Sequence, residues 1–140
     1  MRLVQRWKCD LKKPMSCHME INEDQLVVIS RVVHEAIRAF CMAHGDNSQP
    51  PYDKIEDWMR EATLQGIRFR LENPSAPNSA QHDQWMQQKM EDGWVHGAVK
   101  DGEKKTHPML IAYEELPYVE KQKDALFAAI VEALYFRQIG

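Results

Sequence analysis

Apolar residues recur at helical spacing in four stretches of the chain. In the first stretch they lie three or four residues apart, which is typical of an amphipathic helix with one buried face. Asn22 precedes this stretch as a candidate N-cap with Gln25 as its capping-box partner, and Gly45 follows as a stop. The apolar positions that predict a helix between Asn22 and Gly45 are Leu26, Ile29, Val33, Ala36, Ile37 and Phe40.

Three further helices are predicted downstream. The second begins at a candidate capping box of Asp53 and Glu56, carries apolar residues on two sides, and ends before Pro74. The third covers about Ala80–Asp92, with Trp85 facing inward and Gly93 as its stop. The fourth has Pro117 in its first turn. Its predicted core face consists of Leu126, Phe127, Ile130, Val131 and Leu134.

A small β-hairpin is predicted between the third and fourth helices. Trp94–Val99 and Met109–Tyr113 are the candidate strands, and Asp101-Gly102 is a turn signal between them. The element order is therefore α-α-α-β-β-α. It predicts an α+β fold, mainly helical, in one domain of about four helices with a small β-hairpin. We expect this domain to span residues 22–140, after a weakly structured lead at residues 1–21.

Composition narrows the classes of function. The 140 residues suit one domain, and 44% of them are hydrophobic. The net charge of −3 lacks the basic excess of dedicated nucleic-acid binders, so we expect no nucleic-acid partner. No apolar run approaches the roughly 18–20 residues that span a bilayer, so no membrane partner is expected. Three cysteines and no secretory signal favour a cytoplasmic protein.

Motifs for catalysis or metal binding are weak. Cys9, Cys17 and His18 lie close in sequence, and His34, Cys41 and His44 share the first helix, but neither set has typical zinc spacing. Cys41 on a core face is expected to behave as a small apolar group rather than as a nucleophile with His44 and Asp46. Phosphate-binding glycine loops are absent. We therefore expect no metal, no cofactor and no enzymatic activity.

The segment from Asp92 to Tyr113 carries the most distinctive chemistry. It combines glycines, Trp94, basic side chains and a His-Pro pair within about twenty residues. The mixed charges of Lys100–Lys105 also suit an ordinary solvated turn. A pocket would instead need Trp94 and Tyr113 to converge, so that an aromatic face stacks a base while lysine or histidine meets phosphate.

The same segment resembles the ryanodine receptor repeat, or RyR domain. The resemblance rests on His82-x-x-Trp85, Gly93-Trp94-x-x-Gly97 and His107-Pro108-x-Leu110-x-x-Tyr113. Upstream, Gln49-Pro50-Pro51-Tyr52 and Leu71-Glu72-Asn73-Pro74 resemble stand-alone prokaryotic and phage members. Together the resemblance covers about residues 28–135.

The resemblance implies a compact α+β fold and a sensor of nucleotide-derived signals. We therefore expect a non-catalytic module that binds an adenine nucleotide or an NAD-derived nucleotide, as a sensor or a signal-sequestering protein. The family repeats occur in tandem pairs in calcium channels, so a homodimer would supply a second Trp94. A protein-interaction module using the same Trp/His-Pro surface is the alternative, and an enzyme acting on a nucleotide ranks last. The expected ligand contacts are Trp94, Gly97, Asp101, Lys104, Lys105, His107 and Tyr113.

Overall fold

A computed structural model describes residues 7–9, 17–19 and 22–139 of the chain. Four long helices dominate it, together with short strands, which confirms the predicted mainly helical α+β class. The helices are α1 (Glu23–Ala43), α2 (Asp57–Glu72), α3 (Asn78–Glu91) and α4 (Tyr118–Ile139). Short 3₁₀ helices η1 (Tyr52–Lys54) and η2 (Tyr113–Glu115) precede α2 and α4.

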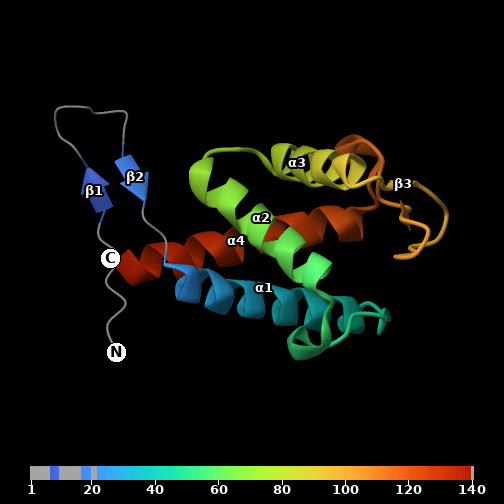
Figure 1. Ribbon diagram of the computed structural model, residues 1–140, viewed down its shortest axis with the longest axis horizontal. Helices are drawn as coiled ribbons and strands as arrows, with labels where there is room; N and C mark the ends of the chain where they lie inside the picture. Colours follow the sequence, from blue (N-terminus) through green and yellow to red (C-terminus); the bar gives the residue numbers. More distant parts are fainter. Residues whose placement is uncertain (1–6, 10–16, 20–21, 140) are drawn as a thin grey trace.

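The core lies where α1, α2 and α4 meet. Figure 1 shows α1 and α4 running side by side, with α2 crossing them and α3 beyond α2. Since each helix turns one apolar face to its neighbours, burial of these faces supplies most of the helical stability. The buried cluster consists of Leu26, Ile29, Val33, Ile67, Leu71, Val131 and Tyr135.

Most predicted helix ends are confirmed. The Asn22 side chain accepts a hydrogen bond from the Asp24 N–H at 2.8 Å, as an N-cap should. Gly45 and Gly93 follow α1 and α3 with φ angles of 86° and 89°, the left-handed conformation that ends helices. The second capping box was wrong. Asp53 lies in η1 and pairs with Arg31 at 2.8 Å, and Glu56 is the N-cap of α2 without a side-chain cap bond.

The predicted β-hairpin was wrong in its pairing and in its second strand. Strands β3 (Val95–His96) and β4 (Thr106–His107) pair in parallel, and residues 109–113 form turns and the start of η2. The Asp101 carboxylate accepts the N–H groups of Glu103 and Lys104, which closes a tight turn before β4. Lys105 has a φ of 54°, and the chain there turns back so that β4 lies along β3.

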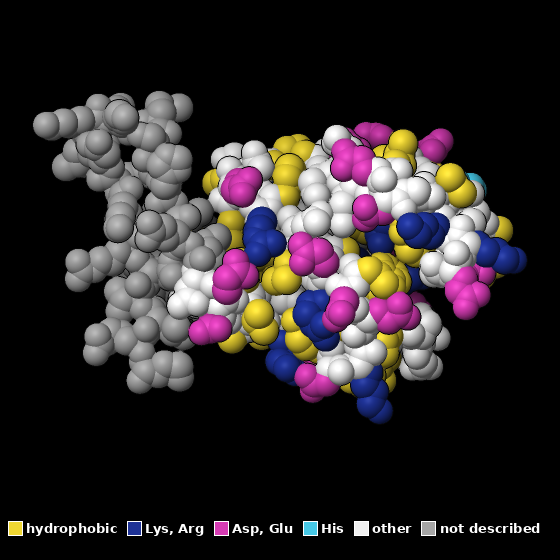
Figure 2. Space-filling view, in the orientation of Figure 1, with side chains coloured by type: hydrophobic (Ala, Val, Ile, Leu, Met, Phe, Trp, Pro, Cys, Tyr) yellow, Lys and Arg dark blue, Asp and Glu magenta, His cyan; other side chains and the backbone are white. Residues whose placement is uncertain are grey.

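Strands β1 (Trp7–Cys9) and β2 (Cys17–Met19) pair antiparallel near the N-terminus. The rest of the predicted lead lies outside the described residues. Within the described part of the chain, no helix is long and apolar enough to cross a bilayer. Acidic and basic side chains alternate on the face shown in Figure 2, so no single-sign patch dominates that face.

Candidate functional site

A continuous run of rings connects α3, η2, β4 and α2. His82 and Trp85 on α3 lie 5.5 Å apart between ring centroids, and the Trp85 ring meets His107 edge-on at 5.0 Å. Tyr113 approaches His82 at 6.1 Å, whereas Trp94 approaches His107 at 6.4 Å. The two aromatics expected to converge therefore lie at different places along this run, with Trp85 between them.

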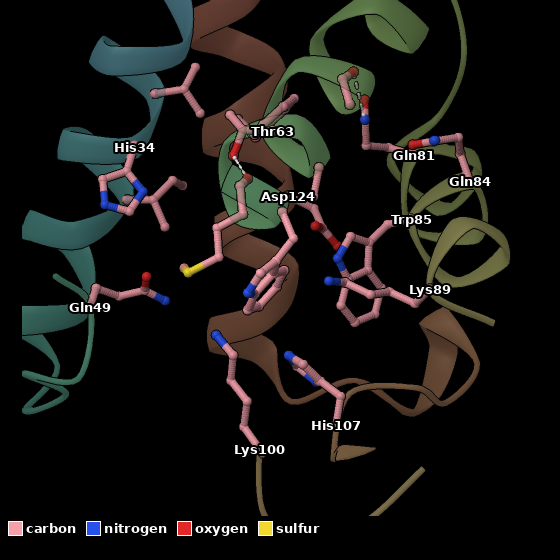
Figure 3. Close-up of a pocket in the computed structure, with 17 residues that line it drawn as sticks. His34, Gln49, Thr63, Gln81, Gln84, Trp85, Lys89, Lys100, His107 and Asp124 are labelled. Carbon is pink, nitrogen blue, oxygen red and sulfur yellow. Dashed lines mark hydrogen bonds between the residues drawn. The ribbon is translucent and has the colours of Figure 1, made fainter. Parts of the chain in front are cut away.

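The run borders a cavity of about 260 Å³ between α1, α2, α3 and α4. Trp58 and Trp85 are among its aromatic lining residues, and Lys89, Lys100, His107 and Asp124 are among its polar ones. Figure 3 shows Trp85 and Lys89 of α3 near Asp124 of α4, with Lys100 and His107 approaching from the segment around β3 and β4. Its volume lies just below the range of about 300–1,000 Å³ that is usual for small-molecule pockets. Apolar walls with a few convergent polar groups are typical of ligand sites.

Lys89 is the most deeply placed cation of the cavity. Only 5% of the residue is exposed, and its ammonium lies 4.3 Å from the Trp58 ring centroid and 4.4 Å from that of Trp94. Burial, and then the charge of Lys100, lower the pKa of Lys89 to about 8. The two ring faces attract the ammonium and hold it in position.

Lys100 and His107 enter the cavity from the segment around β3 and β4. Lys100 is an exposed residue overall, but its ammonium points into the cavity (Figure 3), where burial and then Lys123 lower its pKa. The pKa of His107 is lowered to about 4 by burial and by Lys100, so the ring is neutral at pH 7. Because its Nδ1 accepts the Met109 N–H at 3.0 Å, the neutral ring carries its proton on Nε2. His107 can therefore donate one hydrogen bond but adds no charge.

Neither Lys89 nor Lys100 forms a salt bridge with a residue in the described range. The charge of Lys100 contributes to the lowered pKa of Lys89, so the two ammonium groups create a positive potential in the cavity. Such a site favours an anion, whose charge relieves the repulsion between the ammonium groups.

Asp124 on α4 contributes the acidic group of the cavity. Its Oδ2 atom is buried without a hydrogen-bond partner among the described residues. Burial raises the pKa of Asp124 to about 6, while His82 acts in the opposite direction. The same residue borders an adjacent cavity of about 150 Å³, together with Trp85 and His107.

The predicted site residues are divided between several places. His107 lines the main cavity, whereas Trp94 and Lys105 line a separate hollow of about 250 Å³ that shares Trp58 and Lys89 with it. Trp94 is only 5% exposed, so its faces are covered by protein. The Lys105 ammonium donates to the Asp92 carbonyl at 2.7 Å.

The other predicted contacts serve the local fold in this structure. A Cβ on Gly97 would lie 2.7 Å from the Thr106 Cβ, so glycine permits the close approach of β3 and β4. Asp101 holds the turn described above, and Lys104 is exposed. Tyr113 is half-buried and carries the Lys121 ammonium 5.3 Å from its ring centroid.

Sequence reasoning missed Trp58, Lys100 and Asp124 as site residues. Trp85 was noted as part of a motif, and neither Trp85 nor Lys89 was assigned to the ligand. A signal was present for α3, because Trp85 and Lys89 are four residues apart and so share one helix face. Nothing in the spacing of Trp58 or Asp124 indicates that α2 and α4 bring them to the same cavity.

No cluster of three or more metal-binding side chains occurs among the described residues. His34 is engaged elsewhere, since its Nε2 donates to the Pro50 carbonyl at 2.7 Å. Cys41 is buried, as expected for a core cysteine. The side chains of Cys9, Cys17 and His18 lie outside the described part of the structure.

Comparison with protein families identifies one matching model, that of the RyR domain, at residues 75–136. The match confirms the resemblance drawn from the Gly-Trp and His-Pro blocks. It begins in the loop before α3 and extends into α4, so it includes Trp85, Lys89, Lys100, His107 and Asp124. Trp58 lies outside the matched range, on α2.

Proposed function

We propose that this chain, which carries an RyR domain at residues 75–136, is a non-catalytic module that binds an adenine nucleotide or an NAD-derived nucleotide. The proposal rests mainly on the cavity in which two tryptophan rings accompany two lysines that form no salt bridge with a described residue. Aromatic faces stack planar bases, with about 1–3 kcal/mol per stacked base. The ammonium groups suit phosphate.

The ligand would then lie in the cavity lined by Trp58 and Trp85, and not between Trp94 and Tyr113 as the sequence led us to expect. Trp94 packs on Trp58 with ring centroids 5.3 Å apart, and its ring also contacts the Lys89 ammonium. Trp94 therefore helps to position two residues that line the cavity. His107 keeps its expected role as a phosphate contact, through a neutral Nε2–H donor. The volume of about 260 Å³ suits a mononucleotide better than a dinucleotide.

Isothermal titration calorimetry with AMP, cyclic AMP and ADP-ribose tests the proposal. Lys100→Ala is the informative variant, because its ammonium points into the cavity (Figure 3). Lys104→Ala is the matched control, since it removes the same charge from an exposed position outside the cavity. A charged hydrogen bond contributes about 1.5–3 kcal/mol, so Lys100→Ala should weaken binding by at least about tenfold. Lys104→Ala should leave it nearly unchanged.

Two results contradict the proposal. One is the absence of binding by the folded wild-type protein across the three nucleotides at millimolar concentrations. The other is an equal loss in both lysine variants, which would indicate a diffuse charge effect rather than a seated ligand.

A protein-interaction module remains the second candidate, on one observation. The end of α3 and the segment around β3 expose three large apolar side chains: Met90 at 63%, Val95 at 58% and Val99 at 71%. A partner that covers them would bury apolar area near the same end of the molecule. A pull-down in which Val95→Ser and Val99→Ser remove a protein partner, while Lys100→Ala retains it, would favour this function.

A further inference from the structure

Asp124 is the acidic residue among those that line the cavity, and the proposed function assigns it no role. Its carboxylate lies beside the Trp85 ring (Figure 3), and its buried Oδ2 lacks a hydrogen-bond partner among the described residues. The neighbouring cation, Lys123, is engaged by Glu120 at 2.7 Å. A buried carboxylate oxygen without a donor is costly, so a donor that arrives with a ligand would relieve that cost.

Charge fixes the orientation of an anionic ligand in this cavity. Phosphate is attracted to the Lys89 and Lys100 ammonium groups and repelled by the Asp124 carboxylate, which Figure 3 shows on the opposite side of the cavity from Lys100. The uncharged end of the ligand therefore faces Asp124. A base stacked on Trp85 brings its edge, rather than its phosphate, to the carboxylate.

We propose that Asp124 is a specificity-determining residue, whose carboxylate accepts a hydrogen bond from an exocyclic amino group of the bound base. The inference rests on the proposed nucleotide-binding function and adds the residue that recognises the base and the group of the base that it contacts. A site built to accept a ligand N–H rejects an analogue that lacks it, because the carboxylate is then left buried and unpaired. The raised pKa of Asp124, about 6, still leaves the group mainly ionised at pH 7 and able to accept.

Calorimetry with AMP and purine riboside 5′-monophosphate, which differ only in the 6-amino group, isolates this contact. Wild-type protein should bind AMP about tenfold more tightly than the analogue. Asp124→Leu removes the acceptor and should abolish the preference, whereas Asp124→Asn keeps an acceptor oxygen and should retain part of it. Circular dichroism of each variant establishes that the helices are intact.

The outcomes separate this inference from the proposed function. If wild-type protein binds both nucleotides equally, and Lys100→Ala weakens both, the cavity binds nucleotides but Asp124 does not read the amine. A preference that persists in Asp124→Leu overturns the inference in the same way. If wild-type protein instead prefers AMP to 2′-deoxy-AMP, and Asp124→Leu abolishes that preference, the carboxylate contacts the ribose and the inference is wrong. If wild-type protein binds neither nucleotide, both proposals fail together.

Discussion

Asp124→Asn should make the free protein more stable at neutral pH. The pKa of Asp124 is about 6, against 3.8 for an ordinary aspartate, because burial disfavours the ionised form. One pKa unit corresponds to about 1.4 kcal/mol, so ionised Asp124 costs the fold up to about 3 kcal/mol at pH 7. Asparagine removes the charge but leaves a polar amide in the cavity, so we expect a net gain of about 1–2 kcal/mol.

The stabilisation by Asp124→Asn should also depend on pH, which makes the prediction more specific. Between pH 3.8 and 6 the folded state binds the Asp124 proton more tightly than the unfolded state does, so wild-type stability falls as pH rises through this window. At pH 4.5 the cost of the carboxylate is about 1 kcal/mol, against about 3 kcal/mol at pH 7.5. The advantage of Asp124→Asn should therefore shrink by about 2 kcal/mol at the lower pH.

Urea denaturation followed by circular dichroism, at pH 7.5 and at pH 4.5, measures both quantities. Glu103→Gln, which neutralises an exposed carboxyl, is the control and should change stability little at either pH. The titratable groups that act on Asp124 are His82, Glu120 and Lys123, and all three remain in the variant. An advantage of Asp124→Asn that is the same at both pH values, or a loss at pH 7.5, would refute the reasoning.

Three further predictions concern the cavity, the core and the β3–β4 contact. The affinity for cyclic AMP, whose phosphodiester does not titrate in this range, should fall between pH 7 and pH 9 as Lys89 (pKa about 8) loses its proton, and Lys89→Met should flatten this calorimetric profile. Ile67→Ala, at a residue with 0% exposure, should lower the free energy of unfolding by about 2–5 kcal/mol in urea, whereas Val99→Ala should change it by less than about 0.5 kcal/mol. Gly97→Ala should lower the melting temperature by calorimetry, because its Cβ would meet β4 at 2.7 Å, while Gly102→Ala, with its nearest atom at 3.8 Å, should be tolerated.

The helices could be predicted from the sequence because their determinants are local. Asn22, Gly45 and Gly93 act through backbone geometry within one turn of the helix end. Their roles as helix caps and stops can therefore be predicted from one sequence. The parallel pairing of β3 with β4 could not be predicted from local sequence signals. It depends on the turn held by Asp101 and on the positive φ of Lys105, neither of which the strand pattern specifies.

The lining of the candidate cavity was predicted only in part, because residues from distant segments of the chain form it. The resemblance drawn from the Gly-Trp and His-Pro blocks agrees with the RyR-domain match at residues 75–136, and His107 of the second block lines the cavity. Aromatic character, however, does not reveal whether a ring is a ligand face or a packing element. Trp94 is covered by Trp58 and Lys89, and only the packing of α2 on α3 shows that Trp58 lies at the cavity instead.

Native mass spectrometry of the protein as purified from cells tests the central claim most directly. The account predicts that wild-type protein carries a nucleotide-sized anionic ligand, that Lys104→Ala retains it, and that Lys100→Ala loses it. A folded wild-type protein that carries no ligand, and gains no mass when AMP, cyclic AMP or ADP-ribose is added, would contradict the claim that the tryptophan–lysine cavity is a nucleotide site.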